Sequence, residues 1–236
     1  MWAKRFIRRL FRLRPSDSRV ATQMRADWDE RARKNARHYV ATLKEEWSDQ
    51  EFFESGDEWI RSYILPDLPL VCGNRSPAEM RILEIGCGAG RMTRGLSEIF
   101  GLVDAVDVSA EMVAIARTAL AGHPNVSLHV NNGVDLSLFG SAEFDFVFSA
   151  IVFQHIPSKS IVTNYFREAA RLLRPGGVFK FQVQGCEIDE AHADTWVGVG
   201  FSEQEMHALA RKIGFSIHAT SGAGTQEFWL TFIKTR

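Results

Sequence analysis

The sequence predicts an α/β fold in which helices cover both faces of a doubly wound, mostly parallel sheet. Short apolar runs alternate with helical patterns from residue 80 onward, which is the pattern of such a sheet. A glycine-rich turn at 86–90 joins the first apolar run to the helical pattern that follows it. The region before the sheet has only helical patterns, at 19–47 and 57–64, and these predict an N-terminal helical cap.

Composition limits the classes of protein to consider. The 236 residues suffice for one α/β domain and an appendage. The formal net charge of −1 gives no reason to expect a nucleic-acid partner. The three cysteines Cys72, Cys87 and Cys186 lie far apart, which favours neither disulfides nor zinc and suits a reducing, cytoplasmic location. No run approaches the roughly 18 apolar residues of a membrane-spanning helix, so we expect a soluble or peripheral protein.

Residues 1–18 read as a basic amphipathic arm. Six basic residues fall within 1–14, and no acid precedes Asp17. On a helical wheel the apolar residues fill one half and the basic residues except Arg14 fill the other, a profile that suits peripheral contact with an anionic membrane. Packing on the chain's own domain or on a second subunit would use the same pattern. An acid-poor, arginine-rich start also resembles an organelle transit peptide, whereas the apolar region of a secretory signal is missing.

Residues 19–79 are interpreted as a helical cap, or lid, followed by a linker. A break at 15–18 precedes a long helix over 19–47, and a second helix runs over 57–64 after a Ser-Gly pair. The stretch 69–77 reads as the linker into the sheet.

Residues 80–236 are expected to form the main domain. Ser109 caps the second crossover helix, and a capping box of Ser202 and Glu205 opens the last helix, which Gly214 closes. The last two strands suit an antiparallel pair at the sheet edge. The expected strands are 81–85, 102–107, 126–131, 144–149, 178–184, 217–220 and 226–234. The expected helices are 91–100, 110–120, 158–173 and 202–213.

The turn after the first strand suits ligand binding. Gly86, Gly88 and Gly90 lack Cβ atoms where a ligand must approach the backbone, and the amides that open the next helix are unpaired donors. The spacing is G-x-G-x-G and not the dinucleotide fingerprint G-x-G-x-x-G. Asp107 ends the second strand, where a carboxylate can accept both hydrogen bonds of a ribose diol. The site is therefore expected to hold a nucleoside.

Four separated stretches, 83–90, 106–109, 144–149 and 172–177, resemble in order and spacing the Rossmann-like class I S-adenosylmethionine-dependent methyltransferases. The resemblance covers the chain from about residue 80 to its end. It implies a seven-stranded sheet of order 3-2-1-4-5-7-6 with an antiparallel last strand. It also implies S-adenosyl-L-methionine as the cofactor, with S-adenosyl-L-homocysteine as its product.

The resemblance also implies which residues bind the cofactor. The glycines would line its methionine end, and Glu84 would brace the loop or reach a water by the amino group. Asp107 would hold the ribose, with Val108 and Met112 beside the adenine. Residues 132–134 would contact the adenine edge, although the family has Asp more often than Asn at position 132. The expected cofactor-binding residues are Glu84, Gly86, Cys87, Gly88, Gly90, Asp107, Val108, Met112, Asn132, Gly133, Val134 and Ser149.

Methyl transfer depends chiefly on holding a nucleophile in line with the activated methyl group in a dry pocket. A base helps only when the nucleophile must lose a proton. His155, after the fourth strand, is the candidate base or substrate ligand, and its alternative role is structural. Gln154 and Tyr39 are further candidates for the catalytic site.

Two regions are expected to supply the acceptor pocket. The cap offers aromatic and basic lid candidates, which could equally be simple core: Trp28, Arg31, Tyr39, Trp59 and Tyr63. The segment 186–201 offers Glu187, Asp189, His192 and Trp196.

Missing motifs narrow the acceptor. Residues 149–152 are not the Asn/Asp-Pro-Pro-aromatic tetrapeptide of amino-group methylases, and 149–154 contain no acids for Mg²⁺. We therefore predict a metal-independent methyltransferase acting on a small molecule, glycan or lipid headgroup, at oxygen. Sulfur or carboxylate acceptors remain open. The alternatives from other classes are an inactive cofactor-binding scaffold that partners another enzyme, and a nicotinamide oxidoreductase, which the glycine spacing disfavours.

Overall fold

The structure is a computed structural model that describes residues 16–188 and 192–235. The predicted basic arm at 1–14 and the candidate Asp189 lie outside the described residues.

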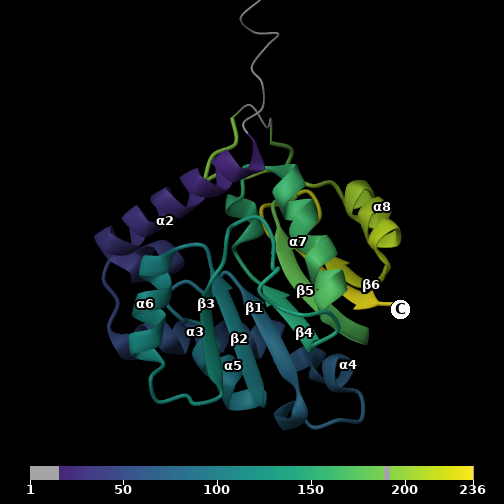
Figure 1. The fold of residues 1–236 in the computed structure, drawn as a ribbon, viewed down its shortest axis with the longest axis horizontal. Helices are drawn as coiled ribbons and strands as arrows, with labels where there is room; N and C mark the ends of the chain where they lie inside the picture. Colours follow the sequence, from purple (N-terminus) through teal and green to yellow (C-terminus); the bar gives the residue numbers. More distant parts are fainter. Residues whose placement is uncertain (1–15, 189–191, 236) are drawn as a thin grey trace, which may run out of the picture.

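The sheet has the predicted order. Seven strands are arranged as β3-β2-β1-β4-β5-β7-β6, and β7 runs antiparallel to both β5 and β6 (Figure 1). The other neighbouring pairs are parallel. The strands are β1 (Arg81–Ile85), β2 (Leu102–Asp107), β3 (Val126–Val130), β4 (Phe144–Ser149), β5 (Leu173–Val183), β6 (Phe215–Ser221) and β7 (Phe228–Lys234).

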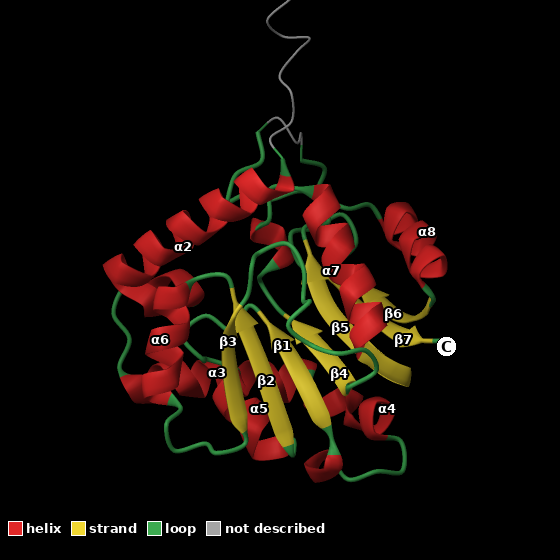
Figure 2. Ribbon diagram, in the orientation of Figure 1, coloured by secondary structure: helices red, strands yellow, loops and turns green. Residues whose placement is uncertain are grey.

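Helices cover both faces of the sheet, as expected from the alternating pattern (Figure 2). On one face α7 (Lys159–Leu172) and α8 (Glu203–Ile213) bury a core rich in phenylalanine, in which Phe179 and Phe181 stack at 4.2 Å. On the other face lie α3 (Asp49–Tyr63), α4 (Leu68–Cys72) and α5 (Thr93–Ile99). The helix α6 (Ala110–Ala119) packs against β2 and β3. Burial on both faces explains the nearly continuous apolar character of the central strands.

The cap differs from the prediction in where its helices begin and end. The first described helix, α2, spans Asp17–Val40 and therefore ends before residue 47, where the predicted helix ended. It is kinked at Asn35. The helix α3 begins at Asp49, because a capping box of Ser48 and Glu51 opens it. The predicted start after Gly56 is wrong: a Cβ on Gly56 would lie 2.1 Å from the carbonyl oxygen of Arg91, so this glycine serves close packing inside the helix.

Other boundaries also move. The predicted linker contains α4 and is flanked by 3₁₀ turns at Leu65–Asp67 and Pro77–Glu79. The helix α5 begins two residues later than predicted, because residues 88–92 form turns. The strand β5 begins at Leu173, and the register between β4 and β5 shifts between Phe144 and Phe146. The proline and glycines at 175–177 therefore lie inside an irregular strand, where a turn was expected.

The helix α2 runs across the carboxyl ends of the strands (Figure 1). Side-chain contacts hold it at several points along its length. Asp17 accepts hydrogen bonds from Ser158 and Ser160 before and within α7, and Arg31 donates to the backbone oxygen of Thr195 at 3.0 Å. These contacts place α2 where a lid would lie. Within the described residues, no helix combines the length and apolar character needed to cross a membrane.

Candidate active site

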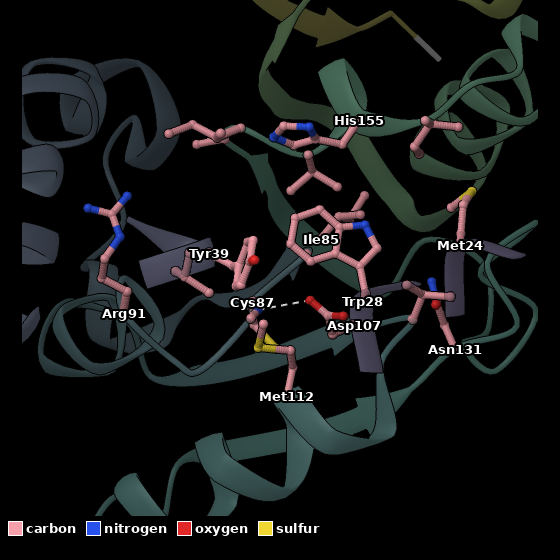
Figure 3. A pocket seen from close by; sticks show the side chains of 18 of the residues that line it. Met24, Trp28, Tyr39, Ile85, Cys87, Arg91, Asp107, Met112, Asn131 and His155 are labelled. Carbon is pink, nitrogen blue, oxygen red and sulfur yellow. Dashed lines mark hydrogen bonds between the residues drawn. The ribbon is translucent and has the colours of Figure 1, made fainter. Parts of the chain in front are cut away.

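A cavity of about 90 Å³ lies between α2 and the carboxyl ends of β1 and β2 (Figure 3). Its floor includes Gly86, Cys87 and Gly88 of the glycine turn and Asp107 at the end of β2. Its roof comes from α2, through Met24, Trp28, Tyr39 and Val40. The carboxyl ends of parallel strands are where open α/β sheets bind ligands, so this is the candidate site.

The glycines of the turn have two different roles. A Cβ on Gly86 would lie 2.2 Å from a methyl group of Val152, and one on Gly88 would lie 2.7 Å from a methyl group of Val40. Both glycines line the cavity. Gly90 does not: a Cβ there would lie 2.9 Å from Leu120, so it allows the turn to pack near the end of α6. The missing Cβ atoms at Gly86 and Gly88 therefore let Val152 and Val40 approach the backbone at the cavity wall.

Asp107 is fixed at the cavity wall by two backbone amides. One carboxylate oxygen accepts from the amide of Gly88 at 2.9 Å, and the other accepts from the amide of Ser109 at 2.9 Å. Each carboxylate oxygen has a second acceptor position. Burial raises the pKa of Asp107, and hydrogen bonds from the backbone oppose this effect. Two oriented oxygens at this point fit the adjacent hydroxyls of a ribose.

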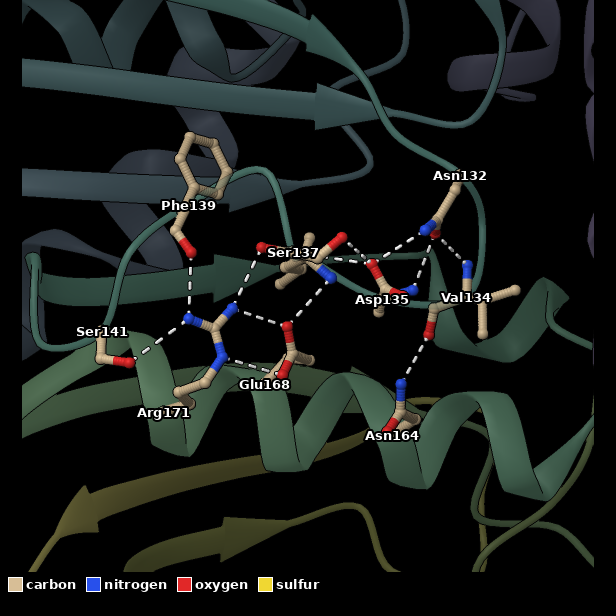
Figure 4. Close-up of polar contacts among 10 residues, drawn as sticks. Asn132, Val134, Asp135, Ser137, Phe139, Ser141, Asn164, Glu168 and Arg171 are labelled. Carbon is tan, nitrogen blue, oxygen red and sulfur yellow. Dashed lines mark hydrogen bonds and ion pairs between the residues drawn. The ribbon is translucent and has the colours of Figure 1, made fainter.

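The predicted adenine-binding residues divide into two groups. Val108 and Met112 line the cavity. Asn132 is exposed and does not: its side-chain oxygen accepts from the amides of Val134 and Asp135 and so builds the turn after β3 (Figure 4). Val134 and Gly133 are also absent from the cavity wall.

Asn131, which sequence reasoning missed, takes the place next to the cavity. It is buried, and it donates to the hydroxyl of Tyr165 at 2.7 Å. The turn beyond it is held by Arg171, which donates to the backbone oxygens of Leu136 and Phe139 and pairs with Glu168 (Figure 4). Two adjacent asparagines follow the third strand, and only the fold decides which one faces the cavity.

Two of the residues predicted to bind the cofactor are buried beside the cavity and do not line it. Glu84 is buried, accepts from the hydroxyl of Thr93 at 2.6 Å, and has its pKa raised to about 7 by burial. Ser149 is buried and donates to the backbone oxygen of Ile85 at 3.0 Å. Neither residue lines the cavity. Cys87 does, and burial raises the pKa of its thiol.

A second, larger cavity of about 500 Å³ adjoins the first. The two cavities share Tyr39, Val40, Arg91, Ile151 and His155. Aromatic rings and side-chain amides make up much of the remaining wall. These lining residues are Trp59, Trp196, Gln154, Gln182, Gln184 and Gln226.

His155 lies between the two cavities and is part of a buried hydrogen-bond chain. Its Nδ1 lies 2.7 Å from the backbone oxygen of Trp196, which can only accept, so Nδ1 carries the proton. Its Nε2 is therefore an acceptor, 3.2 Å from Nε2 of Gln154. The side-chain oxygen of Gln154 in turn accepts from Gln182 at 2.6 Å. Burial lowers the pKa of His155 to about 4, so the ring is neutral near pH 7.

Three of the five lid candidates, Trp28, Tyr39 and Trp59, line the cavities, and Arg31 packs behind them. Trp28 packs edge-on to His155, with 5.5 Å between the ring centres. The guanidinium of Arg31 lies 4.6 Å from the centre of the Trp28 ring and donates a hydrogen bond to the hydroxyl of Thr195. Tyr39 lines both cavities and Trp59 lines the second. Tyr63 lines neither cavity; its ring stacks on Trp229 at 4.5 Å and lies 5.0 Å from the ring of Trp59.

The segment 186–201 contributes less than predicted. Trp196 and Val197 line the second cavity. Glu187 and His192 are exposed and absent from both walls. Across 16–188 and 192–235, no cluster of three or more His, Cys, Asp or Glu side chains is arranged to hold a metal ion.

Comparisons with known proteins agree with this arrangement. Residues 82–177 match a family model described as a methyltransferase domain. A ubiquinone biosynthesis O-methyltransferase from Xanthomonas axonopodis pv. citri is 31% identical over 111 residues. The match covers 47% of this chain and 45% of that relative, so the chain matches less than half of the relative's length.

Two solved structures are similar in fold. Phosphoethanolamine N-methyltransferase 1 of Haemonchus contortus has a TM-score of 0.71 at 16% identity, over 95% of this chain and 51% of that one. Magnesium protoporphyrin IX methyltransferase of Synechocystis has a TM-score of 0.65 at 17% identity, over 95% of this chain and 100% of that one. Residues 82–177 therefore match a methyltransferase domain, and the chain has the same class I Rossmann-like fold as these methyltransferase structures.

Proposed function

We propose that this chain transfers a methyl group from S-adenosylmethionine to an oxygen atom of a small-molecule acceptor, without a metal ion. The observation that carries this proposal is the carboxylate of Asp107, held by the amides of Gly88 and Ser109 beside the side-chain-free backbone of the glycine turn. This arrangement presents hydrogen-bond acceptors for a ribose next to a surface that a thioether chain can follow.

The residues of the first cavity fit such a cofactor. Asp107 would accept from the two ribose hydroxyls, and the backbone at 86–88 would lie under the methionine chain. Val108 and Met112 would pack against the adenine, with the buried Asn131 near its polar edge. When bound, S-adenosylmethionine supplies an activated methyl group on a sulfonium. The chain's contribution is then to align the acceptor and to exclude water.

The second cavity is the proposed acceptor site, because it joins the first at Ile151 and His155. His155 is neutral and directs the lone pair of Nε2 to Gln154. We assign it the role of holding Trp196, which lines the second cavity, through the hydrogen bond to the Trp196 backbone oxygen. A pKa of about 4 makes His155 a weak base near pH 7. The choice of oxygen is supported by relatives that are named O-methyltransferases.

Calorimetry with S-adenosylhomocysteine and with NAD tests the cofactor assignment, because only the first should bind. Transfer of an isotope-labelled methyl group to a panel of hydroxylated acceptors then tests the reaction. Cofactor binding without transfer to any acceptor class would favour the catalytically inactive scaffold. Binding of NAD alone would overturn the proposed function.

A further inference from the structure

Arg91 is a buried cation at the boundary of the two cavities. It directly follows the glycine turn, is 4% exposed, and lines both cavity walls. Figure 3 shows Arg91 at the left of the drawn side chains, whereas Asp107 lies near their centre. Its guanidinium lies 5.2 Å from the ring centre of Trp59 in α3.

The guanidinium has few partners among the described residues. Its Nε has no hydrogen-bond partner, and Nη1 lies 3.4 and 3.5 Å from the backbone and hydroxyl oxygens of Ser55, at the long limit for hydrogen bonds. No carboxylate within residues 16–188 and 192–235 forms an ion pair with it. Glu84 acts on it only through charge and is itself bonded to Thr93. Burial lowers the pKa of Arg91 to about 10, in keeping with this lack of partners.

An unpaired buried charge is costly to the folded protein, because the water it loses is not replaced. Arginine presents a planar fork of donors that matches a carboxylate. Building on the proposed function, we propose that the second cavity takes an acceptor that carries a carboxylate, and that Arg91 pairs with this group.

The position of the guanidinium favours the acceptor over the cofactor as the source of the carboxylate. It packs on Trp59, which lines the second cavity and not the first. The same cavity presents the rings of Tyr39 and Trp196 and the amides of Gln184 and Gln226. The carboxylate of Glu227 also lines it and is exposed to solvent. Such walls suit a hydroxylated ring. A carboxylate paired with arginine is a weakened nucleophile, so it would anchor the acceptor while a separate hydroxyl receives the methyl group.

The test compares acids with their neutral amides. Calorimetry on protein saturated with S-adenosylhomocysteine would measure binding of formate, benzoate and 4-hydroxybenzoate, each against its amide. We expect at least one acid to bind about tenfold or more tightly than its amide. Arg91→Gln and Arg91→Met should abolish that preference. Arg61→Gln is the matched control, because Arg61 is exposed on α3 and lines neither cavity, and it should keep the preference.

Two further measurements separate this proposal from its rivals. If Arg91 held the cofactor, Arg91→Gln would weaken S-adenosylhomocysteine tenfold or more and leave methylthioadenosine, which lacks the carboxylate, unchanged; that result would overturn the acceptor assignment. An arginine with only a structural role would lower the melting temperature when replaced. We expect Arg91→Met to melt no lower than the parent in the absence of ligand. No acid preference with any of the three pairs would also overturn the proposal, while leaving the cofactor assignment intact.

Discussion

Asp29 in α2 and Ser109 at the start of α6 are joined by a hydrogen bond of 2.6 Å between the Asp29 carboxylate and the Ser109 hydroxyl. The same carboxylate oxygen accepts from the amide of Glu111 at 3.2 Å. Asp29 thus adds an acceptor at the N-terminus of α6, where backbone amides lack helical partners. This contact fastens α2 to the start of α6, two residues from Asp107.

We expect α2 to move before a nucleoside enters, because the cavity of about 90 Å³ is below the roughly 300–1,000 Å³ of ligand sites. Asp29→Ala should therefore speed both association and dissociation of S-adenosylhomocysteine, by about three- to tenfold if one hydrogen bond of about 1 kcal/mol is lost. Stopped-flow tryptophan fluorescence, reporting on Trp28, would measure both rates. Glu30→Ala is the control, since Glu30 is exposed and pairs with Lys34 at 2.5 Å. Equal rates in the two variants would contradict a latch at Asp29.

Asp107→Ala should weaken S-adenosylhomocysteine by about 1.5–3 kcal/mol, the range for hydrogen bonds to a charged group. Asp107→Asn should lose less, because it keeps one acceptor oxygen. Calorimetry would measure both affinities. Melting curves would check that loss of the bonds from Gly88 and Ser109 has not unfolded the site. Unchanged affinity in a folded Asp107→Ala protein would reject the ribose assignment.

His155 should make stability depend on pH on the acid side. The unfolded chain protonates this histidine below about pH 6.5, whereas burial lowers the pKa of His155 in the folded chain to about 4. The neutral ring therefore contributes about 3 kcal/mol to the free energy of unfolding above pH 6.5, and this contribution is lost as pH falls to 4. Denaturant titrations of the parent and His155→Gln between pH 4 and 7 would show this. Parallel pH profiles would mean that the ring titrates normally.

Glu84 should act in the opposite direction. Burial raises the pKa of Glu84 from 4.5 to about 7 in the folded chain, so the folded state holds its proton more tightly than the unfolded state. The stability it contributes is present below pH 4.5 and is lost as pH rises through 7. The free energy of unfolding of Glu84→Gln should therefore rise by about 2 kcal/mol relative to that of the parent between pH 5 and 8.5. Urea titrations at several pH values would measure this difference. If the difference in free energy of unfolding between parent and variant did not change with pH, the pKa of Glu84 would not be raised by burial.

Gly56→Ala should destabilise the protein by about 1–3 kcal/mol through overpacking, although alanine is normally the better helix former. A Cβ at this position meets the backbone of Arg91 at 2.1 Å, and backbone cannot rotate away as a side chain can. Gly122→Ala is the control, because nothing lies within 4 Å of its Cβ position. Urea denaturation would compare the two. Equal effects would show that α3 can shift without cost.

Much of the fold could be predicted from local signals. Buried strands have apolar runs, Ser109 and the box of Ser202 and Glu205 cap their helices as expected, and Gly214 ends α8 with a φ of 86°. The helices of the cap were harder to predict, because Ser55 and Gly56 look like a helix break in the sequence although both lie inside α3. The reason that residue 56 is glycine is a contact with Arg91, 35 residues away, which no local pattern reveals.

The sequence by itself determined the order of strands and helices, the glycine turn and the placing of Asp107 at a strand end, because these follow from short-range periodicity and spacing. The tertiary structure alone decided that Asn131 and not Asn132 borders the cavity and that His155 is enclosed by Trp28 and Trp196. It also decided that Nε of Arg91 has no hydrogen-bond partner among the described residues. Burial and pairing are properties of neighbours far apart in the chain. They appear only when the cap lies across the ends of the strands.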